Sequence, residues 1–113
     1  MTAKPDPTTA RSLADRLEEV HVVDVREQGE WDAGHIEGST HIPLAELMSG
    51  HVEALPTDRP IVAVCSVGQR SQVAALLLQA RGHEAYNLGQ GLEAWVAEGH
   101  PLTTPDGTPG RVA

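Results

Sequence analysis

Short apolar runs rich in β-branched residues alternate along the chain with segments in which apolar residues recur at helical spacing. The runs read VHVVDV, THIP, IVAV and EAYNL, at residues 20–25, 40–43, 61–64 and 84–88. Runs that are apolar on both faces are typical of parallel strands covered by helices on both sides. Because strands and helices alternate, we predict an α/β domain with a mainly parallel central sheet and helices on both of its faces.

The clearest helix is predicted over residues 71–81, with Gly82 as the left-handed residue that ends it. Its apolar residues have the i, i+3, i+4, i+7 spacing of a buried face. These residues are Val73, Leu76, Leu77 and Ala80. The other predicted helices are a first one capped by Thr9 or Ser12, two short ones at residues 28–33 and 44–48, and a last one at residues 92–98.

Both ends of the chain are rich in threonine and proline, and the C-terminal stretch lacks apolar periodicity. Segments of this kind are typical of mobile tails. We therefore predict one domain over residues 12–102, a flexible N-terminal tail over residues 1–11 and a flexible C-terminal tail over residues 103–113.

Composition narrows the class of protein. With 113 residues, 40% of them hydrophobic and 21% charged, the chain fits one globular domain. Its formal net charge of −8 argues against nucleic acid and anionic membranes as partners. The sequence shows neither a long apolar run nor the start of a secretory signal, so we predict a cytoplasmic protein. Its one cysteine, Cys65, excludes an intrachain disulfide.

One segment, PIVAVCSVGQRS at residues 60–71, carries the candidate chemistry. Its apolar strand ends at Cys65 and a helix follows, and ligand sites of parallel α/β sheets lie at this end of the strands. Gly68 permits a turn whose N–H groups converge on the sulfur, and the positive end of the helix adds to their effect. Arg70 is close by, and residues 60–82 contain no acidic residue. We therefore predict a lowered pKa for Cys65 and a nucleophilic sulfur at neutral pH.

The alternative is that Cys65 is a small buried hydrophobic residue, as most free cysteines are. The loop argues against this, because its polar and flexible residues suit a solvent-facing cradle better than a core. These residues are Ser66, Gly68, Gln69 and Ser71. Ser71 is further predicted to cap the following helix while its hydroxyl faces the loop.

Longer stretches of the chain resemble a known family. They read VVDVREQGEWDAGHIEGSTHIPLAEL, VCSVGQRS, ARGHEAYNLGQG and EAW, at residues 22–47, 64–71, 80–91 and 93–95. Together they make the chain similar, over residues 12–102, to the single-domain rhodanese family of sulfurtransferases. The resemblance implies a parallel sheet flanked by helices, and a transferable sulfur carried by Cys65. It also implies a loop that holds the substrate and the persulfide, made of Ser66, Val67, Gly68, Gln69, Arg70 and Ser71.

For a member of this family we expect the Cys65 thiolate to take the outer sulfur of thiosulfate or a persulfide and to pass it to a thiol, a protein cysteine or cyanide. No cofactor is predicted. The chain departs from the family at Ser66, where many members have arginine. Dianionic thiosulfate is therefore expected to bind poorly, and a persulfide to be the better donor. Gln90 stands where many members have glycine and affects only that turn.

Asp24 and Arg26 follow the first long strand, near the predicted site. We interpret them as a buried pair or hydrogen-bond network that supports the loops, with Glu30 as a candidate partner of Arg26. The histidines, at positions 21, 35, 41, 51, 83 and 100, show no compact ligand spacing, so no metal site is predicted.

Two other functions stay open at this point. A cysteine phosphatase is disfavoured because its loop places five residues between cysteine and arginine, whereas four separate Cys65 from Arg70. The second is a non-catalytic interaction or sulfur-sensing module that keeps the fold. The presence of Cys65, Gly68 and Arg70 argues against that module.

Overall fold

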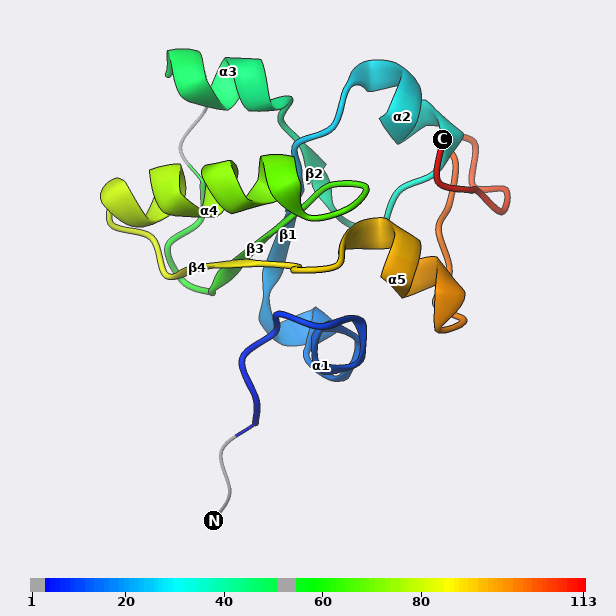
Figure 1. Ribbon diagram of the computed structural model, residues 1–113, viewed down its shortest axis with the longest axis horizontal. Helices are drawn as coiled ribbons and strands as arrows, with labels where there is room; N and C mark the ends of the chain where they lie inside the picture. Colours follow the sequence, from blue (N-terminus) through cyan, green and yellow to red (C-terminus); the bar gives the residue numbers. More distant parts are fainter. Residues whose placement is uncertain (1–3, 51–54) are drawn as a thin grey trace.

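Parallel strands form the centre of the molecule, as Figure 1 shows. The structure is a computed structural model that describes residues 4–50 and 55–113. His51 and residues 1–3 of the predicted N-terminal tail lie outside these ranges. Within them, the strands form one four-stranded parallel sheet in the order β2-β1-β3-β4. The strands are β1 (His21–Asp24), β2 (Thr40–His41), β3 (Ile61–Val64) and β4 (Ala85–Asn87).

Helices cover both faces of this sheet, which confirms the predicted α/β architecture. They are α1 (Ala10–Asp15), a 3-10 turn η1 (Leu17–Glu19), α2 (Gln28–Ala33), α3 (Leu44–Ser49), α4 (Gln69–Ala80) and α5 (Gly91–Ala97). One hydrophobic cluster joins the sheet to α1 and α5, and a second joins it to α3 and α4 (Figure 1). Helix α2 lies apart from both clusters, next to the C-terminal end of the chain.

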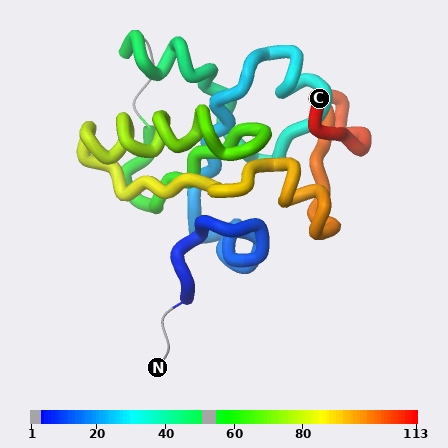
Figure 2. The backbone as a smooth tube through the Cα atoms, viewed as in Figure 1, coloured from blue at the N-terminus to red at the C-terminus, as the bar shows by residue number. Residues whose placement is uncertain are grey.

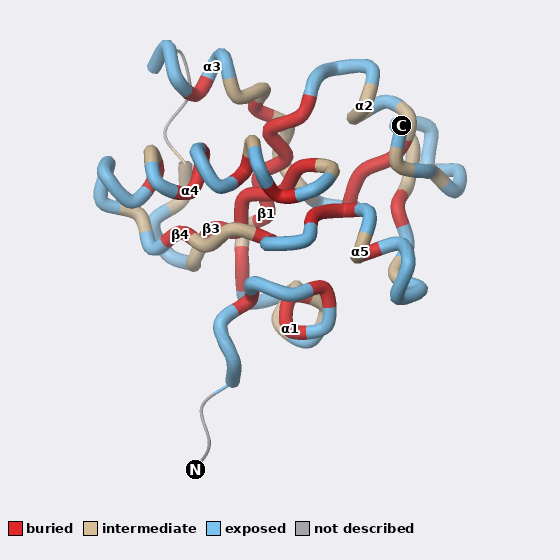
Figure 3. Tube along the Cα trace, viewed as in Figure 1, coloured by how far each residue is buried: buried red, intermediate tan, exposed pale blue. Residues whose placement is uncertain are grey.

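The core is divided between the two faces by the alternation of side chains along each strand. Val62 and Val64 of β3 point into the α1 and α5 cluster, whereas Ile61 and Ala63 point into the α3 and α4 cluster. All four are fully buried, and the buried positions in Figure 3 follow the strands and the inner faces of the helices. Cys65 continues this alternation and belongs to the α3 and α4 cluster.

Helix α1 begins after Thr9, which decides between the two predicted caps. The Thr9 hydroxyl accepts the Ser12 backbone N–H at 3.1 Å, and the Ser12 hydroxyl accepts the Thr9 N–H at 3.1 Å. This reciprocal capping box satisfies two backbone donors that the first turn of a helix leaves free. Ser12 therefore contributes from inside the helix and is not its cap.

The predicted buried face of α4 is wrong. Val73 is 42% exposed and Leu76 is 56% exposed, and Ala80 also faces solvent; only Leu77 packs partly against the core. The buried positions have the same spacing two residues earlier, at Ser71, Ala74, Ala75 and Leu78. Both stripes are largely apolar, so hydrophobic periodicity alone does not distinguish them.

The two chain ends pack against the domain where the sequence predicts flexible tails. Near the N-terminus, the Thr8 carbonyl accepts the Gly89 N–H at 3.0 Å. At the C-terminus, Thr103 exchanges two backbone hydrogen bonds with His35, and the Arg111 N–H donates to Ala33 at 2.9 Å. Figure 2 shows the last residues returning beside α2. Backbone hydrogen bonds thus connect both chain ends to the domain, and the boundaries at residues 12 and 102 stay a prediction.

Close contact makes Gly34 the attachment point of the C-terminal segment. A Cβ at Gly34 would lie 2.5 Å from the Arg111 nitrogen, far inside van der Waals contact. Glycine at this position therefore lets residues 110–111 lie directly against the end of α2.

Leu78→Ala and Leu76→Ala form a matched pair that tests the buried face of α4. Because Leu78 is 1% exposed and Leu76 56% exposed, the first change should lower the free energy of unfolding by about 2–5 kcal/mol. The second should lower it by less than about 0.5 kcal/mol. Urea denaturation measures both values, and equal losses would contradict the assignment.

Removal of residues 103–113 tests the attachment of the C-terminal segment. We expect Tm to fall by about 4–8 °C, the shift that a loss of about 1 kcal/mol produces in a domain of this size. Gly34→Ala should lower Tm in the full chain but have little further effect in the shortened one. An unchanged Tm after truncation would support the predicted flexible tail instead.

Candidate active site

The Cys65 loop connects β3 to α4 at the carboxyl edge of the sheet. Two glycines bring it against the turn that follows β4. Gly68 has φ of +96°, and a Cβ there would lie 2.1 Å from the Gly89 carbonyl oxygen. Gly91 has φ of +68°, and a Cβ there would lie 2.3 Å from the Ser66 carbonyl oxygen. Both the backbone conformation and the available space therefore require glycine at these two positions.

Backbone and side-chain donors converge on the Cys65 sulfur. The Gly68 N–H donates to Sγ at 3.1 Å, and the Ser71 N–H donates at 3.4 Å. The Ser71 hydroxyl lies 3.2 Å from the same atom. The loop thus places fixed hydrogen-bond donors around the sulfur, which is the arrangement that stabilises a negative charge.

These donors lower the pKa of the Cys65 thiol. Burial of the sulfur raises the pKa, because it disfavours the charged form. Hydrogen bonds from the Ser71 hydroxyl, the Ser71 N–H and the Gly68 and Val67 backbone outweigh burial, so the pKa lies below its ordinary value. The thiolate, which is the reactive form, is therefore favoured.

The sulfur does not face solvent as the sequence predicts. Cys65 is 0% exposed and packs in the cluster that contains Val23 and Ala74. The loop residues around it are more open, since Val67 is 52% exposed and Gln69 also faces solvent. The polar character of the loop therefore reflects the exposure of its outer residues, while the sulfur lies beneath them.

Ser71 has a different place from the one predicted, and it has a partner that the sequence did not reveal. Gly68 occupies the cap position of α4 without a side-chain hydrogen bond, so Ser71 is not the cap. The Ser71 hydroxyl faces the loop as predicted, and its single proton is shared between two acceptors, Asn87 Oδ1 at 2.5 Å and Cys65 Sγ at 3.2 Å. The Asn87 amide donates to the Gly68 carbonyl at 3.1 Å and to Gln72 at 2.9 Å. Asn87 at the end of β4 therefore ties the loop to the first turn of α4.

Glu30 pairs with Arg70, not with Arg26 as the sequence suggested. The Arg70 guanidinium donates to the two Glu30 carboxylate oxygens at 2.7 and 2.9 Å, and the Ser66 hydroxyl donates at 3.1 Å. The hydrogen bond from Arg70 is the main reason that the pKa of Glu30 falls to about 2. The same pair raises the pKa of Arg70. Glu30 is therefore ionised at neutral pH and joins both ends of the loop to α2.

Asp24 and Arg26 form a fully buried ion pair. The Arg26 Nη2 atom donates to Asp24 at 2.7 Å and to the Gly34 carbonyl at 2.7 Å, and both side chains are 0% exposed. The Arg26 carbonyl is bonded to His41 at 2.7 Å. Neither side chain has a hydrogen bond to the Cys65 sulfur among the described residues, so the pair holds α2 and the strand ends in place.

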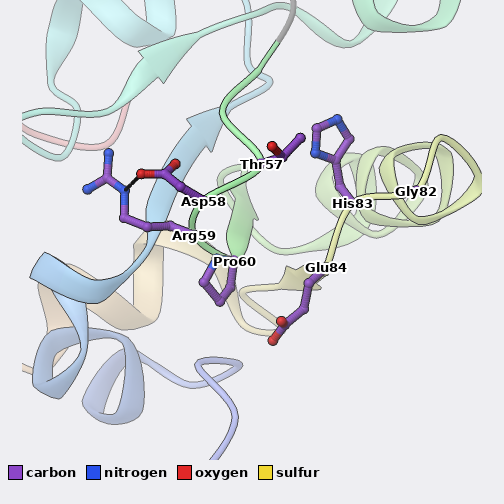
Figure 4. Close-up of a pocket in the computed structure, with 7 residues that line it drawn as sticks. All are labelled: Thr57, Asp58, Arg59, Pro60, Gly82, His83 and Glu84. Atoms are coloured by element: carbon purple, nitrogen blue, oxygen red, sulfur yellow. Dashed lines mark ion pairs between the residues drawn. The ribbon is translucent and has the colours of Figure 1, made fainter.

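A cavity lies at the opposite end of the sheet from the Cys65 loop (Figure 4). It has a volume of about 110 Å³ and lies next to Pro60 and Glu84, the residues just before β3 and β4. Figure 4 shows Asp58 and Arg59 on its rim, paired with each other, and His83 on another side. Because the cavity contains no part of the Cys65 loop, the candidate chemistry stays at the carboxyl edge.

Comparison with known proteins gives a consistent result. The family model described as "Rhodanese-like domain" matches residues 9–98. The chain is 35% identical to thiosulfate sulfurtransferase GlpE of Pseudomonas fluorescens, over 91% of this chain and 92% of that protein. It is 36% identical to the probable adenylyltransferase/sulfurtransferase MoeZ of Mycobacterium tuberculosis, over 88% of this chain but only 26% of MoeZ. The chain thus spans about a quarter of that relative.

Solved structures share the fold. A rhodanese-related protein from Thermoplasma volcanium superposes with a TM-score of 0.78 and 30% sequence identity, covering 84% of this chain and 94% of that one. Within residues 4–50 and 55–113, no helix has the length and apolar character needed to cross a membrane.

Ser71→Ala tests the origin of the lowered pKa. Loss of the Ser71 hydroxyl should raise the pKa of Cys65 by about one unit, because a hydrogen bond to a charged group is worth about 1.5–3 kcal/mol and part of this is lost to relaxation. The rate of alkylation of Cys65 by iodoacetamide, measured against pH, gives the pKa. Ser39→Ala, in a remote turn where the hydroxyl bonds to Ile36, serves as the control. A profile that does not move in Ser71→Ala would contradict the assignment.

Proposed function

This chain belongs to the rhodanese-like domain family, and we propose that it is a sulfurtransferase that carries sulfane sulfur as a persulfide on Cys65. The observation that carries the proposal is the set of donors at the Cys65 sulfur, from Gly68 and from Ser71. Within residues 4–50 and 55–113, no histidine or carboxylate is hydrogen-bonded to this sulfur, so fixed dipoles must hold its negative charge, and this loop supplies them.

In the first step, the Cys65 thiolate attacks the outer sulfur of the donor. With thiosulfate, the bond between its two sulfur atoms breaks, sulfite leaves with the electron pair, and Cys65 becomes a persulfide anion. With a protonated persulfide RSSH, the bond between its two sulfur atoms breaks, the thiolate RS⁻ leaves with the electron pair, and the proton stays on the new persulfide. The donors from Gly68 and Ser71 offset the charge on the sulfur before and after this step.

In the second step, an acceptor takes the outer sulfur and Cys65 leaves as the thiolate. The acceptor is a thiol, a protein cysteine or cyanide, each of which supplies the attacking electron pair. Because Cys65 is the only cysteine of the sequence, no internal thiol can attack the persulfide, and the sulfur leaves only to an external acceptor. A lone thiolate of this kind persists in a reducing compartment, so the proposal includes a cytoplasmic location.

Movement of the loop is part of the proposal, because Cys65 is 0% exposed. The loop has few apolar contacts on its outer side, since Val67 is 52% exposed. Segments with little buried surface open at low cost. We infer that displacement of the exposed Val67 gives the donor its path to Sγ, while the Gly68 and Ser71 groups that donate to the sulfur stay in place.

The burial of Cys65 also favours the second candidate, a non-catalytic interaction or sulfur-sensing module. In that function Cys65 would be a core residue, and its sulfur would not accept and release a transferable sulfur atom. A phosphatase has less support, because the loop places four residues between Cys65 and Arg70 and a tetrahedral phosphoryl group needs a larger ring. Intact-protein mass spectrometry and a phosphatase assay together separate the three functions.

The test is mass spectrometry of the intact protein after incubation with thiosulfate or with glutathione persulfide. We expect the mass to rise by one sulfur atom, and addition of cyanide or a thiol to remove it with release of thiocyanate or a persulfide. Cys65→Ser should show no adduct. A wild-type protein that stays unmodified with both donors would support the non-catalytic module, and hydrolysis of a chromogenic phosphate ester would support the phosphatase.

A further inference from the structure

We propose that Glu30 selects the sulfur donor by its charge, acting against dianionic donors such as thiosulfate. The inference rests on the proposed function, because it concerns the donor of that reaction. It assigns to Glu30 a role as a specificity-determining residue beside the loop, which acts through Arg70 and has no part in the bond changes at Cys65.

The position of Glu30 supports this role. Its carboxylate lies between Ser66 and Arg70, the residues at the two ends of the loop, and it accepts hydrogen bonds from both. Its Oε1 atom also accepts the backbone N–H of Glu27 at 2.9 Å, which fixes the side chain to the start of α2. The Glu30 side chain is 22% exposed, so it is partly accessible from outside. The donor is proposed to approach Cys65 from this partly exposed side, the loop entrance, which therefore contains a fixed carboxylate.

Arg70 is the only basic residue between residues 60 and 80. Its guanidinium is already hydrogen-bonded to the Glu30 carboxylate. A guanidinium binds two oxygens of an oxyanion side by side, which is the geometry that Arg70 uses here for the two oxygens of Glu30. The sulfonate oxygens of thiosulfate would need the same N–H groups. A dianion at this entrance thus meets a cation that is already neutralised and a carboxylate that is ionised at neutral pH.

Coulomb repulsion then grows with the charge of the donor. Methanethiosulfonate has the same reactive bond between two sulfur atoms as thiosulfate, but a methyl group replaces one oxyanion and removes one charge. Attack by Cys65 releases methanesulfinate instead of sulfite. The ratio of kcat/KM for thiosulfate to kcat/KM for methanethiosulfonate therefore reports charge selection at the entrance.

Glu30 could instead have a purely structural role, in which it only holds Ser66 and Arg70 in position. Its removal would then lower kcat/KM for both donors by the same factor, because both react with the same Cys65 sulfur in the same surroundings. The ratio between the two donors separates the roles, since only loss of the carboxylate charge changes it.

The experiment measures both kcat/KM values, with cyanide as acceptor, for the wild type, Glu30→Gln and Glu30→Ala. Glutamine keeps the shape and can still accept hydrogen bonds from Arg70, whereas alanine removes charge and contacts together. Glu18→Gln is the matched control, because it also removes one negative charge from the chain but lies exposed on η1.

We expect the ratio to rise roughly fivefold in Glu30→Gln, which corresponds to about 1 kcal/mol for one charge at a partly exposed contact. The ratio should rise similarly in Glu30→Ala, even where kcat/KM falls for both donors. A loss of stability in either variant lowers both kcat/KM values equally and leaves their ratio unchanged. Glu18→Gln should leave it unchanged. An equal ratio in all four proteins, or an equal rise in Glu18→Gln, would overturn the inference while the proposed function stands. Absence of transfer from both donors in every protein would overturn the proposed function and the inference with it.

Discussion

The hydrogen bonds that converge on the Cys65 sulfur are the constraint on which this end of the molecule depends. A sulfur that carries charge beneath a loop needs donors that are already in place, because water does not reach it. Two of these donors come from Ser71, which must point inward from the first turn of α4. Once Ser71 points inward, the helical repeat turns Ala74, Ala75 and Leu78 to the same side. The orientation of Ser71 therefore sets both the hydrogen bonds at the sulfur and the face of α4 that packs in the core.

Much of the fold could be predicted from the sequence. The runs at residues 20–25 and 61–64 are apolar on both faces, a pattern specific to buried parallel strands, and both form strands of the sheet. The buried face of α4 was not predictable from periodicity, because two apolar stripes compete in that helix. The deciding contact, from Ser71 to the Cys65 sulfur, is polar, and hydrophobic periodicity does not reveal it. At the C-terminus, composition does not reveal the backbone hydrogen bonds to Ala33 and His35 that place a segment with few apolar residues against the domain.

The site shows the same division. The Cys65 loop, its glycine and its lowered pKa follow from local sequence, since they depend on residues within one turn of one another. Glu30 and Asn87 do not, because they lie 40 and 16 residues from the groups they contact in the loop, Arg70 and Ser71. The sequence suggested Arg26 as the partner of Glu30, because it is the cation nearer to Glu30 in the sequence. In the structure Arg26 is paired with Asp24 inside the core. Burial of the sulfur was also unpredictable, because the polar residues of the loop reveal the exposure of the loop itself and not of the atom beneath it.

The attachment of both chain ends has a mechanical consequence. Thr8 is bonded to Gly89, which lies against Gly68 of the loop, and Arg111 is bonded to the last residue of α2, the helix that carries Glu30. Tension on either end, from a tethered neighbour or a surface to which the domain is coupled, would thus act on hydrogen bonds that lie beside the Cys65 loop and at the end of α2. Both chain ends are thus connected by backbone hydrogen bonds to the edge of the sheet that carries the Cys65 loop.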